Sequence, residues 1–127
     1  MRSDDDITEI IIGEAIKIHR RLGPGVFEGP YEAFLAHGLR NRGLTVEQQL
    51  ALPVTYDGMT IPLGYRVDLM VEDRVIVELK STTNPNPVYL RQLLTYLRLS
   101  EKRTGLLINF GFDRLKDGIQ RVVNGWG

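Results

Sequence analysis

The sequence predicts an α/β or α+β fold, with helices flanking a mixed central sheet, in a single domain that spans residues 1–127. This prediction depends on apolar periodicity, which is helical in the first third of the chain and two-residue in the middle third. It also depends on a later helical segment that is followed by a short apolar strand. The chain has 127 residues and no cysteine, which excludes a disulfide scaffold, a thiolate metal site and a cysteine nucleophile.

Two helices are expected at the start of the chain. Asp6 and Glu9 have the spacing of an N-cap and its returning glutamate, and apolar residues then recur at helical period until a Gly-Pro-Gly sequence. A second helix is expected, with Pro30 in its first turn and Gly43 at its C-terminal stop. Glu28 therefore lies in or just before the first turn of the second helix.

Extended segments are expected in the middle of the chain, where apolar and polar residues alternate from Val46 onward. Asp57-Gly58 is the strongest hairpin signal in the sequence, because both residues tolerate the positive φ that a tight hairpin turn requires. Further strands are expected over residues 60–63, 65–71 and 74–79.

The last part of the chain predicts one more helix and one more strand. Pro85 and Pro87 cannot continue a strand, and they lead into a helix over residues 88–102. Residues 105–110 are apolar and bounded by glycine, so we expect a buried strand beside a parallel neighbour that is reached across this helix. We expect a weak helix or a loop over residues 113–127.

Charged residues interrupt two of the predicted strands. Side chains two residues apart on a strand share a face, so Glu78 and Lys80 point the same way. If residues 72–74 form the preceding turn, Val71 pairs with Val75 and Asp68 lies directly across from Glu78. A turn that is one residue shorter would place the two carboxylates on opposite faces of the sheet.

Two carboxylates that face each other repel unless a cation lies between them. Mg²⁺ or Mn²⁺ suits such a pair, because these ions prefer hard oxygen ligands and keep several water molecules. Lys80 would then orient a water molecule or stabilise charge on a phosphate. The alternative is a partly exposed ion-pair ladder of Asp68, Glu78 and Lys80. The metal interpretation is favoured because burying charge in apolar strands is costly without a partner.

These residues resemble a known signature. Asp68 followed by Glu78-Leu79-Lys80 is similar to the motif of the PD-(D/E)XK nuclease superfamily. Residues 92–96, with Gln92 first and Tyr96 last, resemble the Q-x-x-x-Y motif of its RecB-like branch. The sequence Gly-Val-Phe-Glu-Gly-Pro-Tyr over residues 25–31 is similar to the pattern that names the bacterial GxxExxY proteins. The resemblance continues over residues 19–25 and 105–111.

The resemblance implies a nuclease-like αβββαβ core with a metal site. It implies that Asp68 and Glu78 bind the metal, that Glu28 approaches it from the second helix, and that Lys80 assists the attacking water. Gln92 and Tyr96 lie one helical turn apart, so they share a face and would position a ligand or a phosphate. Packing of Tyr96 in the core, with Gln92 hydrogen-bonded beside it, is the alternative for this pair.

The expected function is that of a nuclease that depends on Mg²⁺ or Mn²⁺ and hydrolyses the phosphodiester bonds of DNA or RNA, with DNA favoured. Arginines of the second and third helices would contact phosphates, namely Arg40, Arg42, Arg91 and Arg98. The alternative is a catalytically silent nuclease-like module that binds nucleic acid or protein.

We also expect a homodimer, since cutting two strands benefits from two-fold symmetry. The sequence has no apolar signal core and no apolar run of membrane-spanning length, so we expect a cytoplasmic protein without a membrane partner.

Overall fold

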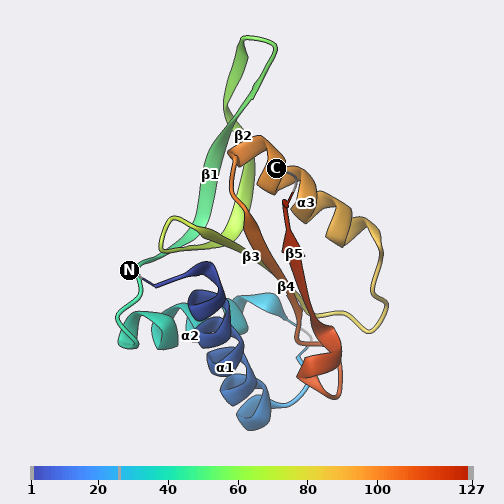
Figure 1. Cartoon of the computed structure of the whole chain (residues 1–127). Coiled ribbons are helices and arrows are strands. Elements are labelled where there is room, and N and C mark those ends of the chain that lie inside the picture. The colour runs from blue at the N-terminus through green and yellow to red at the C-terminus, as the bar shows by residue number, and fades with distance from the viewer. Residues whose placement is uncertain (1, 26, 126–127) are drawn as a thin grey trace.

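A five-stranded mixed sheet, covered by helices on both faces, organises the chain (Figure 1). The structure is a computed structural model that describes residues 2–25 and 27–125. Its elements in chain order are α1 (Asp4–Leu22), α2 (Glu28–Asn41), β1 (Val46–Tyr56), β2 (Met59–Val71), β3 (Val75–Lys80), α3 (Val88–Ser100), β4 (Thr104–Asn109), the 3₁₀ helix η1 (Leu115–Gly118) and β5 (Ile119–Val123). The strand order is β1-β2-β3-β4-β5, so the predicted fold class is confirmed.

The one parallel pair among the described strands is β3 with β4, and the other neighbours are antiparallel. This parallel pairing requires the chain to cross from one end of the sheet to the other, and α3 makes that crossing. The prediction of a buried strand beside a parallel neighbour is therefore confirmed.

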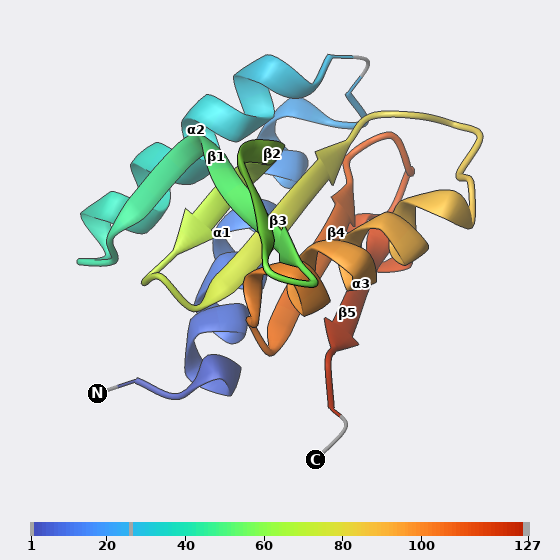
Figure 2. The ribbon, with the colours of Figure 1, turned by 90° about the horizontal axis from the view of Figure 1, so that it is seen from above.

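The sheet separates two apolar clusters. One face packs against α1 and α2 through fully buried side chains such as Ile11 and Leu35, together with Val77 from β3. The other face packs against Leu93 and Leu97 of α3. Figure 2 shows α2 and α3 on opposite sides of the sheet, with the end of β3 reaching the space between them.

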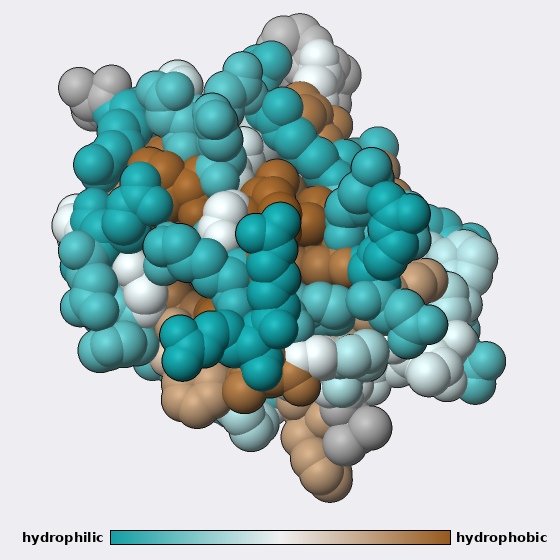
Figure 3. Space-filling view, turned by 90° about the horizontal axis from the view of Figure 1, so that it is seen from below, coloured by the Kyte–Doolittle hydropathy of each residue, from teal (hydrophilic) through white to brown (hydrophobic). Residues whose placement is uncertain are grey.

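The underside of the molecule, where Figure 1 places α1 and α2, is mostly hydrophilic, with smaller hydrophobic areas between the polar side chains (Figure 3). This distribution is expected of amphipathic helices that turn their apolar stripes to a core. Within residues 2–25 and 27–125, no helix combines the length and the apolar character needed to cross a membrane.

Several predicted boundaries are wrong. The N-cap of α1 is Ser3, not Asp6. Asp6 is the third helical residue, and its carboxylate accepts a hydrogen bond from the Ser3 N–H. By contrast, α2 begins at Glu28, so the prediction that Pro30 lies in its first turn is confirmed. The expected strands over 60–63 and 65–71 form the single strand β2, so three strands rather than four precede α3.

The expected weak helix or loop from residue 113 is also wrong in part, because it contains η1 and the edge strand β5. Strand β5 pairs with β4, and pairing with a buried neighbour stabilises a segment whose own apolar pattern is weak. Residues 126–127 of that prediction lie outside the described residues.

The β1–β2 ribbon turns over along its length, which means that side chains near its base are buried under α1 and α2, whereas those farther along are buried under α3. Near its base, Val46 and Leu69 belong to the cluster under α1 and α2. Farther along, Leu50 and Val67, which pair with each other, pack in the cluster under α3. The change falls at Gln49, whose φ is +50° and which lies between the pairs Gln48–Leu69 and Leu50–Val67. Two-residue alternation predicts that Val67 shares a face with Leu69, and this prediction is wrong because the two side chains pack in different clusters.

Candidate functional site

The candidate site lies where the β2–β3 ladder opens. Val71 pairs with Val75, as the longer predicted turn requires, and the last bridged pair is Leu69 with Val77. Beyond that pair, side chains replace the ladder. The Asp68 N–H donates to Oε1 of Glu78 at 3.3 Å, and the Leu79 N–H donates to Oδ2 of Asp68 at 2.8 Å. The two carboxylates thus meet across adjacent strands on one face.

This pair carries an electrostatic cost. Burial is the largest cause that raises the pKa of Glu78 to about 8, and the charge of Asp68 is the next. Ion pairs within residues 2–25 and 27–125 involve other side chains and neither of these two carboxylates. The charge of Lys80 lowers the pKa of Glu78 but does not offset these two causes, so the two hard oxygen donors form a suitable environment for a divalent cation.

The metal site predicted from three carboxylates is less compact than expected. In the described part of the chain, no group of three or more His, Cys, Asp or Glu side chains is close enough to hold a metal ion. Asp68 and Glu78 form the contacting pair. Because Mg²⁺ is commonly held by one or two carboxylates with water in its other positions, this pair still fits such an ion.

Glu28 faces this pair from the start of α2. Its side chain is exposed, and partial loss of water around the carboxyl is the largest cause of its raised pKa. The charge of Lys80 lowers that pKa, whereas the charge of Asp68 raises it. Glu28 is therefore within electrostatic reach of both residues, at the first helical position, where the helix dipole favours an anion.

The segment before α2 is anchored to the end of β4. The Gly25 N–H donates to the Phe110 carbonyl at 2.8 Å, and the ring of Tyr31 stacks on Phe110 with centroids 4.4 Å apart. The Tyr31 hydroxyl donates to the Gly23 carbonyl at 2.8 Å. A Cβ on Gly25 would lie 2.0 Å from the Tyr31 ring, so this approach requires glycine. These contacts fix where α2, and with it Glu28, begins.

Lys80 ends β3 beside an aromatic ring. Its Nζ lies 4.5 Å from the centroid of Tyr89, at the start of α3, in a cation–π contact. The paired residue on β4 is Asn109, whose side-chain amide binds the backbone N–H and carbonyl of Thr82 at 3.0 Å each. Asn109 thereby fixes the backbone that immediately follows Lys80.

Tyr96 of the predicted Q-x-x-x-Y pair packs beside the carboxylates. Its ring stacks on Tyr65 with centroids 4.3 Å apart, and the Tyr65 hydroxyl donates to the Tyr96 carbonyl at 2.9 Å. Burial is the largest cause that raises the pKa of Tyr96, followed by the charges of Glu78 and Asp68. Gln92 lies one turn earlier on α3 and is exposed.

The four predicted arginines occupy two different places. Arg91 and Arg98 are exposed on α3. Arg40, on α2, donates to the Gln48 side chain at 3.1 Å and to the Val46 carbonyl at 2.7 Å. Arg42 follows α2 and lies 3.4 Å from Glu14 of α1. The structure therefore does not bring the two pairs of arginines together.

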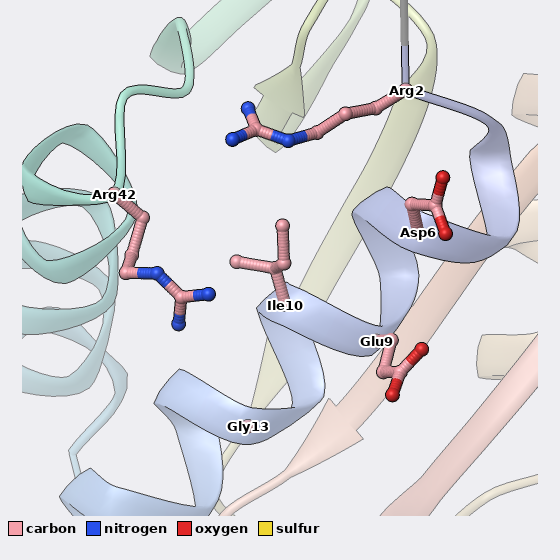
Figure 4. Close-up of a pocket in the computed structure, with 6 residues that line it drawn as sticks. All are labelled: Arg2, Asp6, Glu9, Ile10, Gly13 and Arg42. Carbon is pink, nitrogen blue, oxygen red and sulfur yellow. The ribbon is translucent and has the colours of Figure 1, made fainter.

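Two surface pockets are each lined by a residue predicted for the site, Arg42 in one and Lys80 in the other. One, of about 490 Å³, lies over the N-terminal half of α1, with the side chains of Arg2 and Arg42 extending towards Ile10 from opposite sides (Figure 4). It is remote from the carboxylate pair in the fold. The other, of about 150 Å³, is lined by Lys80 and Tyr89 among others. The second pocket thus opens directly beside the candidate site.

Sequence reasoning missed two residues at the site, Gln49 and Glu32. The Gln49 side-chain Nε2 lies 3.1 Å from Oδ1 of Asp68 and 2.6 Å from Oε1 of Glu32. The signal in the sequence is weak, consisting of a polar run over residues 47–49 that breaks the two-residue alternation of a half-buried strand. Neither residue belongs to a motif that the resemblance supplied.

Comparison with known proteins places the chain among nucleases by sequence. A family model described as the PD-(D/E)XK nuclease superfamily matches residues 5–122. No curated protein matches the chain.

Two solved structures are similar in fold. The crystal structure of SSO0001 is 14% identical, with a TM-score of 0.48, and the alignment covers 95% of this chain and 79% of that one. An alkaline exonuclease (LHK-Exo) from Laribacter hongkongensis is 16% identical, with a TM-score of 0.49, and the alignment covers 98% of this chain and 72% of that one.

Proposed function

The chain belongs to the PD-(D/E)XK nuclease superfamily, and from that premise we propose that it hydrolyses phosphodiester bonds of DNA with the help of a divalent cation. The observation that carries the proposal is the contact between Asp68 and Glu78 where the β2–β3 ladder opens. Glu28 and Lys80 reach the same place from α2 and β3. This set gives carboxylates for a metal and a cation for a phosphate in one location.

Members of this superfamily generally use divalent metal ions. We assign Asp68 and Glu78 as the residues that hold Mg²⁺ or Mn²⁺, with Glu28 as a further carboxylate on the same side. The raised pKa of Glu78 supports this assignment, because burial and the charge of Asp68 together outweigh the charge of Lys80 there. When bound, such an ion supplies a Lewis acid that polarises a phosphate oxygen and lowers the pKa of water.

The chain's own residues have separate roles in this proposal. Lys80 donates a hydrogen bond to the attacking water or to a phosphate oxygen, and Tyr89 holds the Lys80 side chain in place by the cation–π contact. Tyr96 lies near enough to the carboxylate pair for their charges to raise its pKa, and we assign it to limit the access of water to them. Gln92 is exposed one turn away and is assigned to contact the substrate.

We further assign the chain to the GxxExxY proteins of the Q-x-x-x-Y branch. The packing of Gly25 on Tyr31 supports this, because it gives the glycine and the tyrosine of that pattern a common purpose, which is to place the intervening Glu28. A nucleic-acid substrate follows from the superfamily, and the exposed Arg91 and Arg98 on α3 support a phosphate-binding surface.

Cleavage assays test the proposal directly. Supercoiled plasmid, linear duplex, single-stranded DNA and RNA are incubated with the protein in Mg²⁺, in Mn²⁺ and in EDTA. We expect cleavage of DNA with either ion and none in EDTA. Lys80→Met is expected to lower the rate by about 100-fold or more. The matched control is Lys116→Met, because Lys116 is exposed on η1 and the same charge is removed.

The rival function has its own outcome in these assays. Binding of nucleic acid without cleavage in any metal would contradict the proposal and identify a catalytically silent module. Equal rates for Lys80→Met and Lys116→Met would contradict the role of Lys80 while leaving a nuclease.

A further inference from the structure

The Gln49 side chain contacts two carboxylates from different elements. Its Nε2 donates to Oε1 of Glu32 at 2.6 Å and to Oδ1 of Asp68 at 3.1 Å. Ionised carboxylates only accept hydrogen bonds, so the NH₂ end of the amide is the end that faces both. Gln49, on β1, thereby joins α2 to β2 at the edge of the candidate site.

The backbone of Gln49 is unusual as well. Its φ of +50° is in the left-handed region, which residues other than glycine, asparagine and aspartate rarely adopt. The β1–β2 ribbon turns over at this point, so the strained residue has a definite place in the fold. Strained residues persist where the surrounding structure holds them, and they concentrate at functional sites.

Gln49 completes the hydrogen bonds of Asp68. Oδ2 of Asp68 accepts from the Leu79 N–H at 2.8 Å, and Oδ1 accepts from Gln49, so both oxygens are held in one orientation. The second hydrogen of the same amide binds Glu32, which lies one helical turn after Glu28 on α2. One side chain thus fixes Asp68 and the helix that carries Glu28.

We propose that Gln49 is a positioning residue of the nuclease site, which holds Asp68 in the orientation that binds the metal and holds α2 against β2. The inference rests on the proposed function, because the orientation matters through metal binding. Loss of a residue that orients a metal ligand typically costs 10–100-fold in metal affinity.

A matched pair of variants separates this role from a structural one. Gln48 is the adjacent residue, and its Nε2 also binds Glu32, at 3.1 Å from Oε2, but it does not contact Asp68. We compare Gln49→Met with Gln48→Met, because methionine keeps the side-chain length and removes the amide. Calorimetric titration of Mn²⁺ is expected to show an affinity about 10-fold lower for Gln49→Met. Gln48→Met is expected to stay close to the wild type, and both variants keep a cooperative unfolding transition.

NMR of the metal-free protein tests the contact between Gln49 and Asp68 separately from metal binding. In the ¹⁵N NMR spectrum of the metal-free protein, the Gln49 side-chain NH₂ signals are identified by their loss in Gln49→Met, and they are expected to shift in Asp68→Asn. Gln49 signals that do not shift in Asp68→Asn, or an Mn²⁺ affinity of Gln49→Met equal to that of the wild type, overturn the inference alone. An equal loss in both methionine variants assigns the effect to Glu32 and also overturns it. A wild type that binds no Mn²⁺ overturns the proposed function and the inference together.

Discussion

Glu78 is the residue whose protonation the fold controls most strongly. Its carboxyl lies half-buried on β3 beside Asp68, and its pKa is raised from the ordinary 4.5 to about 8. In the metal-free protein, Glu78 is therefore mostly protonated at neutral pH, and binding of a cation there releases a proton. The same pair that suits a metal makes the empty site sensitive to pH.

This sensitivity predicts how stability depends on pH. Between about 4.5 and 8 the folded chain binds the Glu78 proton and the unfolded chain does not, so stability contributed by this group falls as pH rises through that window. The contribution has a maximum slope of about 1.4 kcal/mol per pH unit. Urea unfolding in EDTA at several pH values measures it. Glu78→Gln is expected to flatten the dependence in this window, and an unchanged slope in that variant would contradict the assignment.

A second prediction concerns the contact between Lys80 and Tyr89. The ring face attracts the ammonium group, and the centroid distance is 4.5 Å. Tyr89→Leu removes the ring and is expected to lower kcat by about 2- to 5-fold, the equivalent of a cation–π contact of ~0.5–1 kcal/mol. Tyr89→Phe is the control, because it keeps the ring and removes only the hydroxyl. If the Phe variant loses as much activity as the Leu variant, the hydroxyl rather than the ring supports Lys80.

At the scale of elements, turn chemistry explains what the sequence could predict. Asp57-Gly58 and the pairing of Val71 with Val75 follow from local patterns. The second of these predicted Asp68 opposite Glu78, and the two strands are joined there by hydrogen bonds from backbone N–H groups to the two carboxylates rather than by a bridged pair. Gln49 could not be predicted, because its positive φ is imposed by the turnover of the ribbon rather than by a preference of glutamine. Strand β5 was missed for a similar reason, since pairing with β4 outweighs its weak pattern.

The anchoring of α2 gives a prediction at this scale. Gly25→Ala would place a Cβ 2.0 Å from the Tyr31 ring, so the ring or the loop must move. We expect a loss of about 1–3 kcal/mol in the free energy of unfolding and a lower rate of cleavage, because Glu28 moves with the start of α2. Gly29→Ala is the control, since nothing lies within 4 Å of a Cβ at Gly29. Chemical unfolding of both variants checks this, and equal stabilities would contradict the anchoring role.

At the scale of the whole molecule, the four arginines predicted to contact phosphates lie in two pairs on different parts of the fold. Arg91 and Arg98 extend from α3, the helix that also places Tyr89 against Lys80 and Tyr96 near Glu78 and Asp68. Arg40 and Arg42 form contacts within the chain around α1, α2 and β1. The division favours α3 as the surface that carries the substrate.

Binding of a fluorescent duplex tests which face meets the nucleic acid. The double variant Arg91→Ala with Arg98→Ala is expected to weaken binding and to lower the slope of log affinity against log salt by about 2, one unit for each phosphate that an arginine no longer neutralises. Arg40→Ala with Arg42→Ala removes the same charge from the other face and is expected to leave the salt slope unchanged. The reverse pattern would place the substrate on α2.

Titration of Mn²⁺ by calorimetry tests the central claim, that Asp68 and Glu78 form a metal site. The wild type is compared with Asp68→Asn plus Glu78→Gln, and with the control Asp57→Asn plus Asp73→Asn. The control likewise replaces two carboxyl groups by amides, at two exposed turn positions whose positive φ asparagine tolerates. We expect binding in the wild type and in the control, and none in the site variant. Equal binding by all three proteins, or no binding by the wild type, would contradict the account.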